Sequence, residues 1–201
     1  IYTMEQMLEV LKDNFEGFEE IRQKLISRTP KYGNDEDYAD LITQQIFEIV
    51  YSAVDGRPNT RGGVHRINLL PTTVHIYFGK VTGATPDGRK AYTPLSEGIS
   101  PVQGMDINGP TSVIKSASKI DQLRTGGTLL NQKFSPKFFS SESGINNVAH
   151  LIRSYFKLGG HHIQFNVVSA NTLRAAQTNP VQYHNLIVRV AGYSDYYVNL
   201  G

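Results

Sequence analysis

The chain has 201 residues, which allows one domain with a substantial core or a piece of a larger protein. Apolar residues make up 39% and charged residues 19%, and no stretch reaches the roughly 20 apolar residues of a membrane helix. The formal charge of +2 is too balanced to indicate a nucleic-acid or membrane partner, and the absence of cysteine excludes disulfides and a thiol nucleophile. We expect a soluble segment excised from a longer protein, because the sequence starts without Met and has no leader pattern.

Apolar periodicity predicts helices in the first quarter of the chain. Thr3 and Gln6 form a capping-box pattern in front of the first helical repeat. The same spacing resumes after a glycine and continues until Pro30 stops it, so we expect a pair of helices. Turn residues at 31–35 precede a third, long amphipathic helix that ends near Gly56.

The middle of the chain, residues 57–110, is rich in Gly and Pro and is predicted to be mostly loop. One β-branched and aromatic run at 64–78, interrupted by Pro71, predicts a strand. Residues 85–88, Thr-Pro-Asp-Gly, are typical of a β-turn and leave Arg89 free to hydrogen-bond to neighbouring loops. A loop region of this length is typical of a functional region.

Helix and strand patterns alternate after Pro110, which suits the first position of a short helix. The predicted order is then strand, helix, strand, helix and strand, at residues 128–134, 144–158, 162–168, 170–177 and 186–190. Right-handed crossovers of this kind build parallel sheets or barrels whose functional residues lie on loops at one end. The residues therefore predict an α/β fold with a helical N-terminal section.

Common catalytic and ligand-binding patterns are missing. His161 and His162 would point to opposite faces of a strand, and the sequence has no His-Glu-x-x-His motif. The Gly-rich turns match neither a Walker loop nor a dinucleotide fingerprint, and there is no Gly-x-Ser-x-Gly nucleophile turn. We therefore predict no metal and no bound cofactor, and these patterns by themselves assign no reaction.

Several short segments together carry a resemblance to a known family. They are Gly-Ala-Thr-Pro-Asp-Gly-Arg at 83–89, Pro-Leu-Ser-Glu-Gly-Ile-Ser-Pro at 94–101, Asn-Gly-Pro-Thr at 108–111, Asn-Gln-Lys-Phe at 131–134, His-Ile-Gln-Phe-Asn-Val-Val at 162–168, and Leu-Ile-Val-Arg-Val-Ala-Gly-Tyr-Ser at 186–194. The last run closely resembles the C-terminal signature of the glycyl radical enzymes, and the other segments resemble that family in the same order. The resemblance spans nearly the whole chain.

The resemblance implies that Gly192 carries an organic radical. A radical on an α-carbon is stabilised when that carbon flattens between its amide nitrogen and its carbonyl, and only glycine has no Cβ to oppose this. The resemblance also implies support roles for Arg189 and Tyr193, which would hold the radical loop by hydrogen bonding and packing.

Partners outside the chain are implied as well. In the family, a radical S-adenosylmethionine activating enzyme with an iron–sulfur cluster installs the glycyl radical, which then passes to a cysteine on a second loop. The chain contains no cysteine, so its catalytic pair is incomplete. The resemblance further implies a homodimer for the full-length protein and an anaerobic cytoplasm as its location.

The implied fold is the C-terminal part of a ten-stranded α/β barrel in which the glycine loop and the cysteine loop meet. Thr72 and Thr73 lie on a segment that resembles a family strand facing the substrate cavity, so we expect them to contact substrate. We also expect a helical end of the catalytic domain at 1–56, a loop-rich barrel segment at 57–110 and a glycyl radical domain at 111–201.

The runs at 96–101 and 191–194 resemble the dehydratase branch of the family, which acts on glycerol, propane-1,2-diol or trans-4-hydroxyproline. The expected activity is therefore radical dehydration of a small hydroxylated substrate by a lyase. Formate C-acetyltransferase activity, the choline-lyase branch, a stand-alone spare-part radical domain and a non-catalytic scaffold stay open as alternatives.

Overall fold

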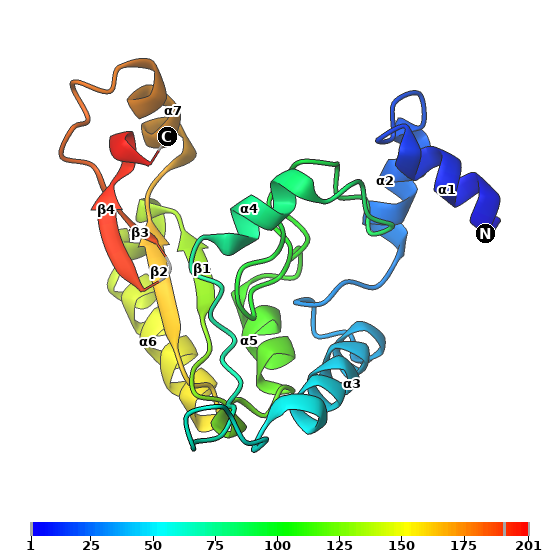
Figure 1. Ribbon diagram of the computed structural model, residues 1–201. Helices are drawn as coiled ribbons and strands as arrows, with labels where there is room; N and C mark the ends of the chain where they lie inside the picture. The colour runs from blue at the N-terminus through cyan, green and yellow to red at the C-terminus, as the bar shows by residue number, and fades with distance from the viewer. Residues whose placement is uncertain (1, 191, 201) are drawn as a thin grey trace.

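The structure is a computed structural model that describes residues 2–190 and 192–200. Figure 1 shows an open arrangement, with α1, α2 and α3 on one side, the strands with α6 and α7 on the other, and α4 and α5 between them. The helices are α1 (Met4–Lys12), α2 (Glu19–Arg28), α3 (Asp37–Val54), α4 (Val74–Val81), α5 (Pro110–Ser118), α6 (Glu142–Lys157) and α7 (Ala170–Thr178). The strands are β1 (Leu130–Phe134), β2 (Ile163–Val167), β3 (Ile187–Val190) and β4 (Tyr193–Tyr196).

The predicted N-terminal helix pair is confirmed. The side chain of Thr3 accepts a hydrogen bond from the backbone of Gln6, and the Gln6 side chain accepts one from the Thr3 backbone, so the capping box is complete. Helices α1 and α2 pack through the buried side chains of Val10, Phe15 and Leu25. Helix α1 is shorter than its apolar pattern, because the backbone of Phe15 has a positive φ of 63° and leaves the helix.

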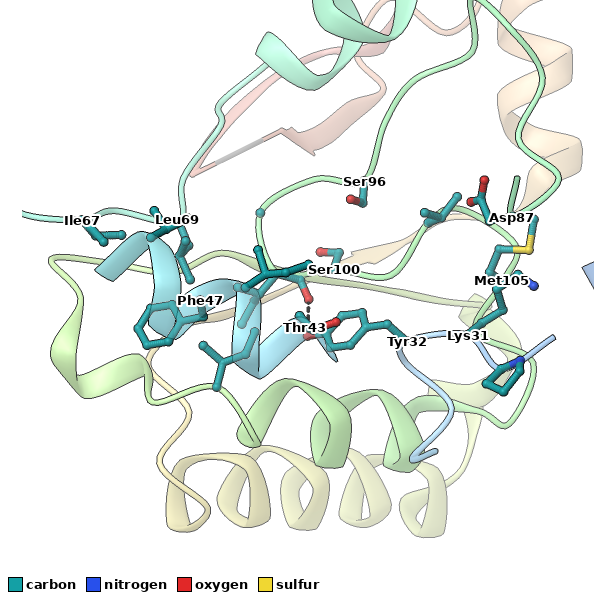
Figure 2. Close-up of a pocket in the computed structure, with 17 residues that line it drawn as sticks. Lys31, Tyr32, Thr43, Phe47, Ile67, Leu69, Asp87, Ser96, Ser100 and Met105 are labelled. Atoms are coloured by element: carbon teal, nitrogen blue, oxygen red, sulfur yellow. Dashed lines mark hydrogen bonds between the residues drawn. The ribbon is translucent and has the colours of Figure 1, made fainter. Parts of the chain in front are cut away.

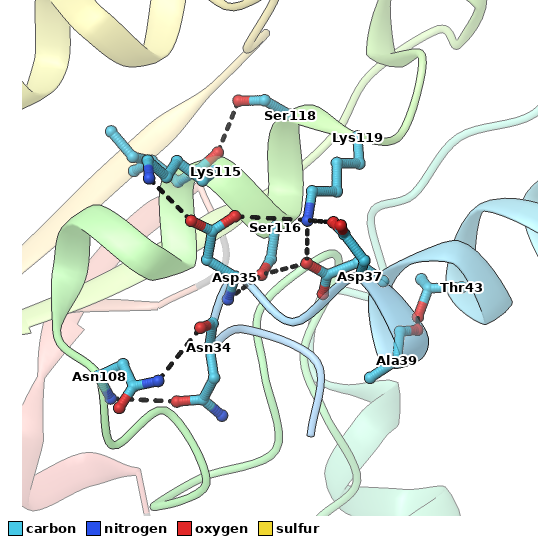
Figure 3. A network of polar contacts seen from close by, with 12 residues as sticks. Asn34, Asp35, Asp37, Ala39, Thr43, Asn108, Lys115, Ser116, Ser118 and Lys119 are labelled. Atoms are coloured by element: carbon cyan, nitrogen blue, oxygen red, sulfur yellow. Dashed lines mark hydrogen bonds and ion pairs between the residues drawn. The ribbon is translucent and has the colours of Figure 1, made fainter. Parts of the chain in front are cut away.

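A polar network fixes the start of α3 against α5 (Figure 3). The carboxylate of Asp40 is fully buried and accepts hydrogen bonds from Ser116 Oγ at 2.9 Å and Lys119 Nζ at 2.7 Å. Lys119 Nζ also lies 2.8 Å from Asp37 and 3.3 Å from Asp35. Burial disfavours the charge of Lys119, but hydrogen bonds to Asp37 and Asp40 raise its pKa above the ordinary value. The network therefore has a structural role.

The prediction of a strand within residues 64–78 is wrong. Val74–Val81 forms helix α4, and the segment before it makes only single bridges, including a parallel one between Leu69 and Thr128. Thr72 has a positive φ of 52°, and the Val74 N–H donates to the carbonyl of Pro71 at 3.0 Å, so the chain turns into a helix here. The short apolar run around Pro71 fits either a strand or a helix, and packing against distant segments decides which of the two forms.

The long loop between α4 and α5 is ordered around one arginine. The predicted β-turn is confirmed by a 3.0 Å hydrogen bond from the Gly88 N–H to the Thr85 carbonyl. The Arg89 side chain is buried and donates to the carbonyls of Gly83 at 2.5 Å and Thr93 at 2.7 Å. These bonds join the two ends of the turn region, as expected for a guanidinium with several donors.

The predicted parallel pairing after α5 is also confirmed. Strands β1 and β2 are parallel, with a register from Leu130 opposite Ile163 to Phe134 opposite Val167, and α6 forms the crossover between them. Helix α6 packs against α5 next to this strand pair. The main core lies there and contains the buried residues Phe47, Ile99, Val113, Ile114, Ala117, Ile120, Leu130 and Tyr155. Among the described residues, none of the helices combines the length and apolar character needed to cross a membrane.

Candidate functional site: the Gly192 hairpin

Gly192 lies at the turn of a β-hairpin. Strands β3 and β4 are antiparallel, and Val190 pairs with Tyr193, so only residues 191 and 192 connect them. Residue 191 is outside the described residues, whereas Gly192 has a φ of +92°, a conformation that glycine adopts readily. The sequence predicted β3 but not β4, whose residues Tyr-Ser-Asp-Tyr lack alternating apolar side chains.

The backbone amide of Gly192 is held by a side chain of β2. The Gly192 N–H donates to Gln164 Oε1 at 3.2 Å, and Gln164 is buried, with 6% of its surface exposed. A Cβ placed on Gly192 would meet no heavy atom of the described residues within 4 Å. Glycine is therefore required here by backbone conformation and not by crowding from this part of the protein.

A second amide side chain, two residues further along β2, also holds the hairpin. The Asn166 side chain donates to the Arg189 carbonyl at 2.8 Å and accepts from the Arg189 N–H at 2.8 Å. Residues 164 and 166 are two apart, so their side chains lie on the same face of β2. We call Gln164 and Asn166 the amide pair. Together these side chains join β2 to both the strand and the turn of the hairpin.

The residues expected to support the loop lie on the same hairpin. Arg189 Nη1 donates to Ser194 Oγ at 3.2 Å, which links β3 to β4. Tyr193 directly follows Gly192 in the chain and is 44% exposed. The positions of Arg189 and Tyr193 are compatible with support of the turn, and their role stays a prediction.

Thr72 and Thr73 lie away from this hairpin in the sequence and on a different element. They form the turn before α4, where Thr72 Oγ1 donates to the Pro71 carbonyl at 2.7 Å and Thr73 is the N-cap without a side-chain cap bond. Within residues 2–190 and 192–200, no hydrogen bond connects either threonine to the hairpin. Their expected contact with substrate stays a prediction.

The amide pair belongs to a wider polar face of β1 and β2 that sequence reasoning missed. Asn131 is the partner of Gln164 in the parallel register, and Lys133 is the partner of Asn166. Cross-strand partners share a face, whereas alternate residues such as Leu130 face the apolar core. The period-two spacing of polar side chains, Asn131 with Lys133 and Gln164 with Asn166, is the signal that could have predicted this face.

Titratable groups beside this face have shifted pKa values. Burial raises the pKa of Glu97 above its ordinary value, although His75, Asn131 and Lys133 act in the opposite direction. Burial, followed by the charge of Arg189, lowers the pKa of His162 below its ordinary value of 6.5. Both effects disfavour the charged form of His162. In the described ranges, no group of three metal-ligating side chains lies together.

A cavity of about 440 Å³ lies elsewhere, between α3 and the loop at 96–102 (Figure 2). Its lining is mostly apolar, and the hydroxyl of Tyr32 donates to the Ile99 carbonyl at 2.9 Å. Burial raises the pKa of Tyr32 well above its ordinary value. None of the described residues that line it belongs to β2 or the hairpin, so this cavity is separate from the Gly192 site.

Comparison with known proteins places this hairpin in a family context. Residues 95–198 match the family described as "Glycine radical", and residues 1–79 match the family described as "Pyruvate formate lyase-like". The chain belongs to the glycyl radical enzyme family. The match at 95–198 includes β1, β2 and the whole hairpin, so the family resemblance of the sequence is confirmed.

Individual glycyl radical enzymes are similar over the entire chain. Trans-4-hydroxy-L-proline dehydratase of Clostridioides difficile is 55% identical over 199 residues, covering 99% of this chain and 25% of that protein. Isethionate sulfite-lyase of Bilophila wadsworthia is 41% identical over 201 residues, covering 98% and 24% respectively. The chain thus spans about a quarter of the length of these curated relatives.

Solved structures agree with the sequence matches. The crystal structure of the Clostridioides difficile hydroxyproline dehydratase with bound substrate has a TM-score of 0.96 and covers 100% of this chain and 25% of its own. Glycerol dehydratase from Clostridium butyricum in its glycerol-bound form has a TM-score of 0.91 at 43% identity, with 100% and 25% covered. The predicted fold class, an α/β segment of the glycyl radical enzyme barrel with a helical N-terminal section, is confirmed.

Proposed function

We propose that this chain is the radical-carrying C-terminal quarter of a glycyl radical dehydratase, and that Gly192 carries the radical. The observation that carries the proposal is the position of Gly192 at the turn of a hairpin inside the family match, where the amide pair holds it. Among the residues that the structure describes, no heavy atom lies within 4 Å of a Cβ built on Gly192, so the α-carbon is uncrowded on that side. The division of the chain at residues 56 and 110 remains part of the proposal.

The chemistry requires hydrogen-atom transfers through Gly192. A radical generated from S-adenosylmethionine by an activating enzyme takes one α-hydrogen and leaves the unpaired electron on the α-carbon. The glycyl radical then takes the hydrogen atom of a cysteine thiol that lies outside this chain, which regenerates the Cα–H bond and leaves a thiyl radical. The thiyl radical takes a hydrogen atom from a substrate carbon, and the substrate radical loses water to give a product radical. The product radical takes the hydrogen atom back from the thiol, which leaves the closed-shell product and regenerates the thiyl radical.

The substrate class that the relatives favour is a small hydroxylated molecule. The relatives described above act on trans-4-hydroxy-L-proline and glycerol, and a similar structure concerns 1,2-propanediol dehydration. The 41% identity to isethionate sulfite-lyase favours a second candidate, a lyase that breaks a carbon–sulfur bond. The proposal includes Thr72 and Thr73 as substrate contacts, Arg189 and Tyr193 as support for the hairpin, a homodimer and a cytoplasmic location.

The test of the radical site uses the full-length protein that contains this segment, activated without oxygen and measured by electron paramagnetic resonance. Gly192→Ala should abolish a glycine-centred doublet, because a Cβ opposes flattening of the radical carbon. Gly159→Ala is the matched control: Gly159 has a φ of +91° and, like Gly192, no heavy atom within 4 Å of the point where a Cβ would lie. A doublet that survives in Gly192→Ala would contradict the assignment.

The same preparations test the reaction. Active protein should release water from one of trans-4-hydroxy-L-proline, glycerol or propane-1,2-diol, measured as the unsaturated or carbonyl product. Sulfite release from isethionate in place of dehydration would favour the second candidate. Absence of a radical in the native protein, with an activating enzyme that works on a control glycyl radical enzyme, would favour a non-catalytic scaffold.

A further inference from the structure

Gln164 combines two features that a packing residue does not need. Its Oε1 accepts the N–H of Gly192 at 3.2 Å, while its Nε2 is buried without a hydrogen-bond partner among the described residues. A buried amide group that lacks a partner costs free energy, so an apolar side chain would be the better choice for packing alone. The side chain is thus placed for its oxygen.

Asn166 and Gln164 hold different parts of the hairpin. Asn166 already fixes the strand by two hydrogen bonds to the backbone of Arg189, each 2.8 Å long. The bond from Gln164 reaches the turn itself, 28 residues further along the chain. It therefore adds little to the attachment of β3, and its specific effect falls on the peptide group of Gly192.

The chemistry of an α-carbon radical makes that peptide group important. The half-filled orbital overlaps with the lone pair of the amide nitrogen on one side and with the carbonyl on the other. An acceptor on the N–H polarises the amide and increases electron density at the nitrogen. It also restricts rotation about the N–Cα bond, so the plane of the radical is fixed relative to the sheet.

We propose that Gln164 is a positioning residue whose side-chain oxygen orients and stabilises the radical on Gly192. The inference rests on the proposed function, because it requires Gly192 to be the radical carrier. It adds a residue of β2, outside the radical loop, to the machinery that determines the lifetime and the geometry of the radical.

A matched control exists on the adjacent strand. Gln132 on β1 is also 6% exposed and also has a buried Nε2 without a partner, but it is the register partner of Phe165 and lies on the opposite face from Gln164. A substitution at Gln132 removes the same kind of buried amide without touching Gly192. Comparison of the two positions therefore separates the effect on the radical from the effect on packing.

The experiment compares Gln164→Leu, Gln164→Glu and Gln132→Leu in the full-length protein, activated anaerobically. The readouts are the yield, line shape and anaerobic lifetime of the glycine-centred signal. We expect Gln164→Leu to lower the yield or lifetime roughly two- to tenfold, the range that one net hydrogen bond contributes to an equilibrium, and to alter the line shape. Gln164→Glu keeps an acceptor oxygen in either protonation state and should restore most of the signal.

The outcomes separate the inference from the function on which it rests. A native signal that is unchanged in Gln164→Leu would overturn the role of Gln164 and leave Gly192 as the carrier. Equal losses in Gln164→Leu and Gln132→Leu would also overturn it, because they would indicate packing alone. No signal in the native protein would overturn the proposed function itself.

The Gln164→Glu variant keeps the test open if Gln164→Leu does not fold. A Gln164→Glu signal with native line shape and lifetime then supports the role of Gln164. A Gln164→Glu protein that folds with native stability but loses the signal overturns that role.

Discussion

At the scale of single residues, Gln122 connects three parts of the core through one buried amide. It is 1% exposed, and its Oε1 accepts from Thr128 Oγ1 at 2.9 Å, Tyr155 Oη at 2.8 Å and the His161 N–H at 3.0 Å. Its Nε2 donates to the carbonyl of Ala117 at 2.9 Å. This side chain therefore links α5, α6 and the entry to β2. Its bonds also satisfy buried polar groups that would be costly without partners.

Gln122→Leu should therefore be strongly destabilising. It leaves two buried hydroxyl donors, those of Thr128 and Tyr155, without an acceptor, and each costs about 1–3 kcal/mol, so we expect a loss of about 2 kcal/mol or more. The measurement is the apparent Tm of the full-length protein by scanning calorimetry. Gln132→Leu, which removes an amide with an unpartnered Nε2, should change the Tm little. Equal decreases in the two variants would contradict this role of Gln122.

At the scale of elements, the hairpin is joined to β2 by side chains and not by a continuous ladder. Strands β3 and β4 form their own two-stranded sheet, separate from the sheet of β1 and β2. Asn166 takes the place of a backbone partner for Arg189, donating to its carbonyl and accepting from its N–H. An attachment of this kind depends on few bonds, so one substitution can loosen the hairpin without unfolding β2.

Asn166→Ala should increase amide hydrogen exchange across residues 187–196, because both bonds to Arg189 are lost. Exchange in β1 and β2 should stay close to that of the native protein. Hydrogen exchange followed by mass spectrometry measures both segments in the full-length protein. Gln177→Ala, at an exposed position of α7, serves as the control. Native protection of 187–196 in Asn166→Ala would show that other contacts hold the hairpin.

At the scale of the whole molecule, two helices expose apolar faces. Side chains on α3 and α4 that are 49–71% exposed include Tyr38, Leu41, Ile46, Ile49, Tyr77, Phe78 and Val81. In Figure 1, α4 lies in the upper middle of the view and α3 at the lower right. Apolar area of this extent is typical of an interface, and the chain spans only about a quarter of its relatives. We expect the remaining part of the barrel to cover these faces.

The isolated segment should bind a hydrophobic fluorescent dye and self-associate. The full-length protein should bind fewer dye molecules per protein molecule and should self-associate less through these faces. Replacement of Ile46 and Ile49 by Ser should lower dye fluorescence of the segment about twofold, because exposed apolar area is what the dye binds. Gln45→Ser, on the same helix, should leave it unchanged. Equal dye binding by the segment and the full-length protein would contradict the prediction that the barrel covers α3 and α4.

The sequence by itself determined the helix pair, α3, the parallel order of β1, α6 and β2, and the family through the run at 186–194. These features depend on short-range periodicity, caps and turn residues, which act within a few positions of the chain. The motif also pointed to Gly192 as the candidate radical site.

Only the tertiary structure decided that residues 74–81 form a helix, that β4 exists, and that the amide pair holds the hairpin. The hydrogen bonds of Gln164 and Asn166 join residues 28 and 23 positions apart, and nothing in a local pattern specifies such partners. Short apolar runs near Pro71 fit either a strand or a helix, and contacts with distant segments determine which one forms.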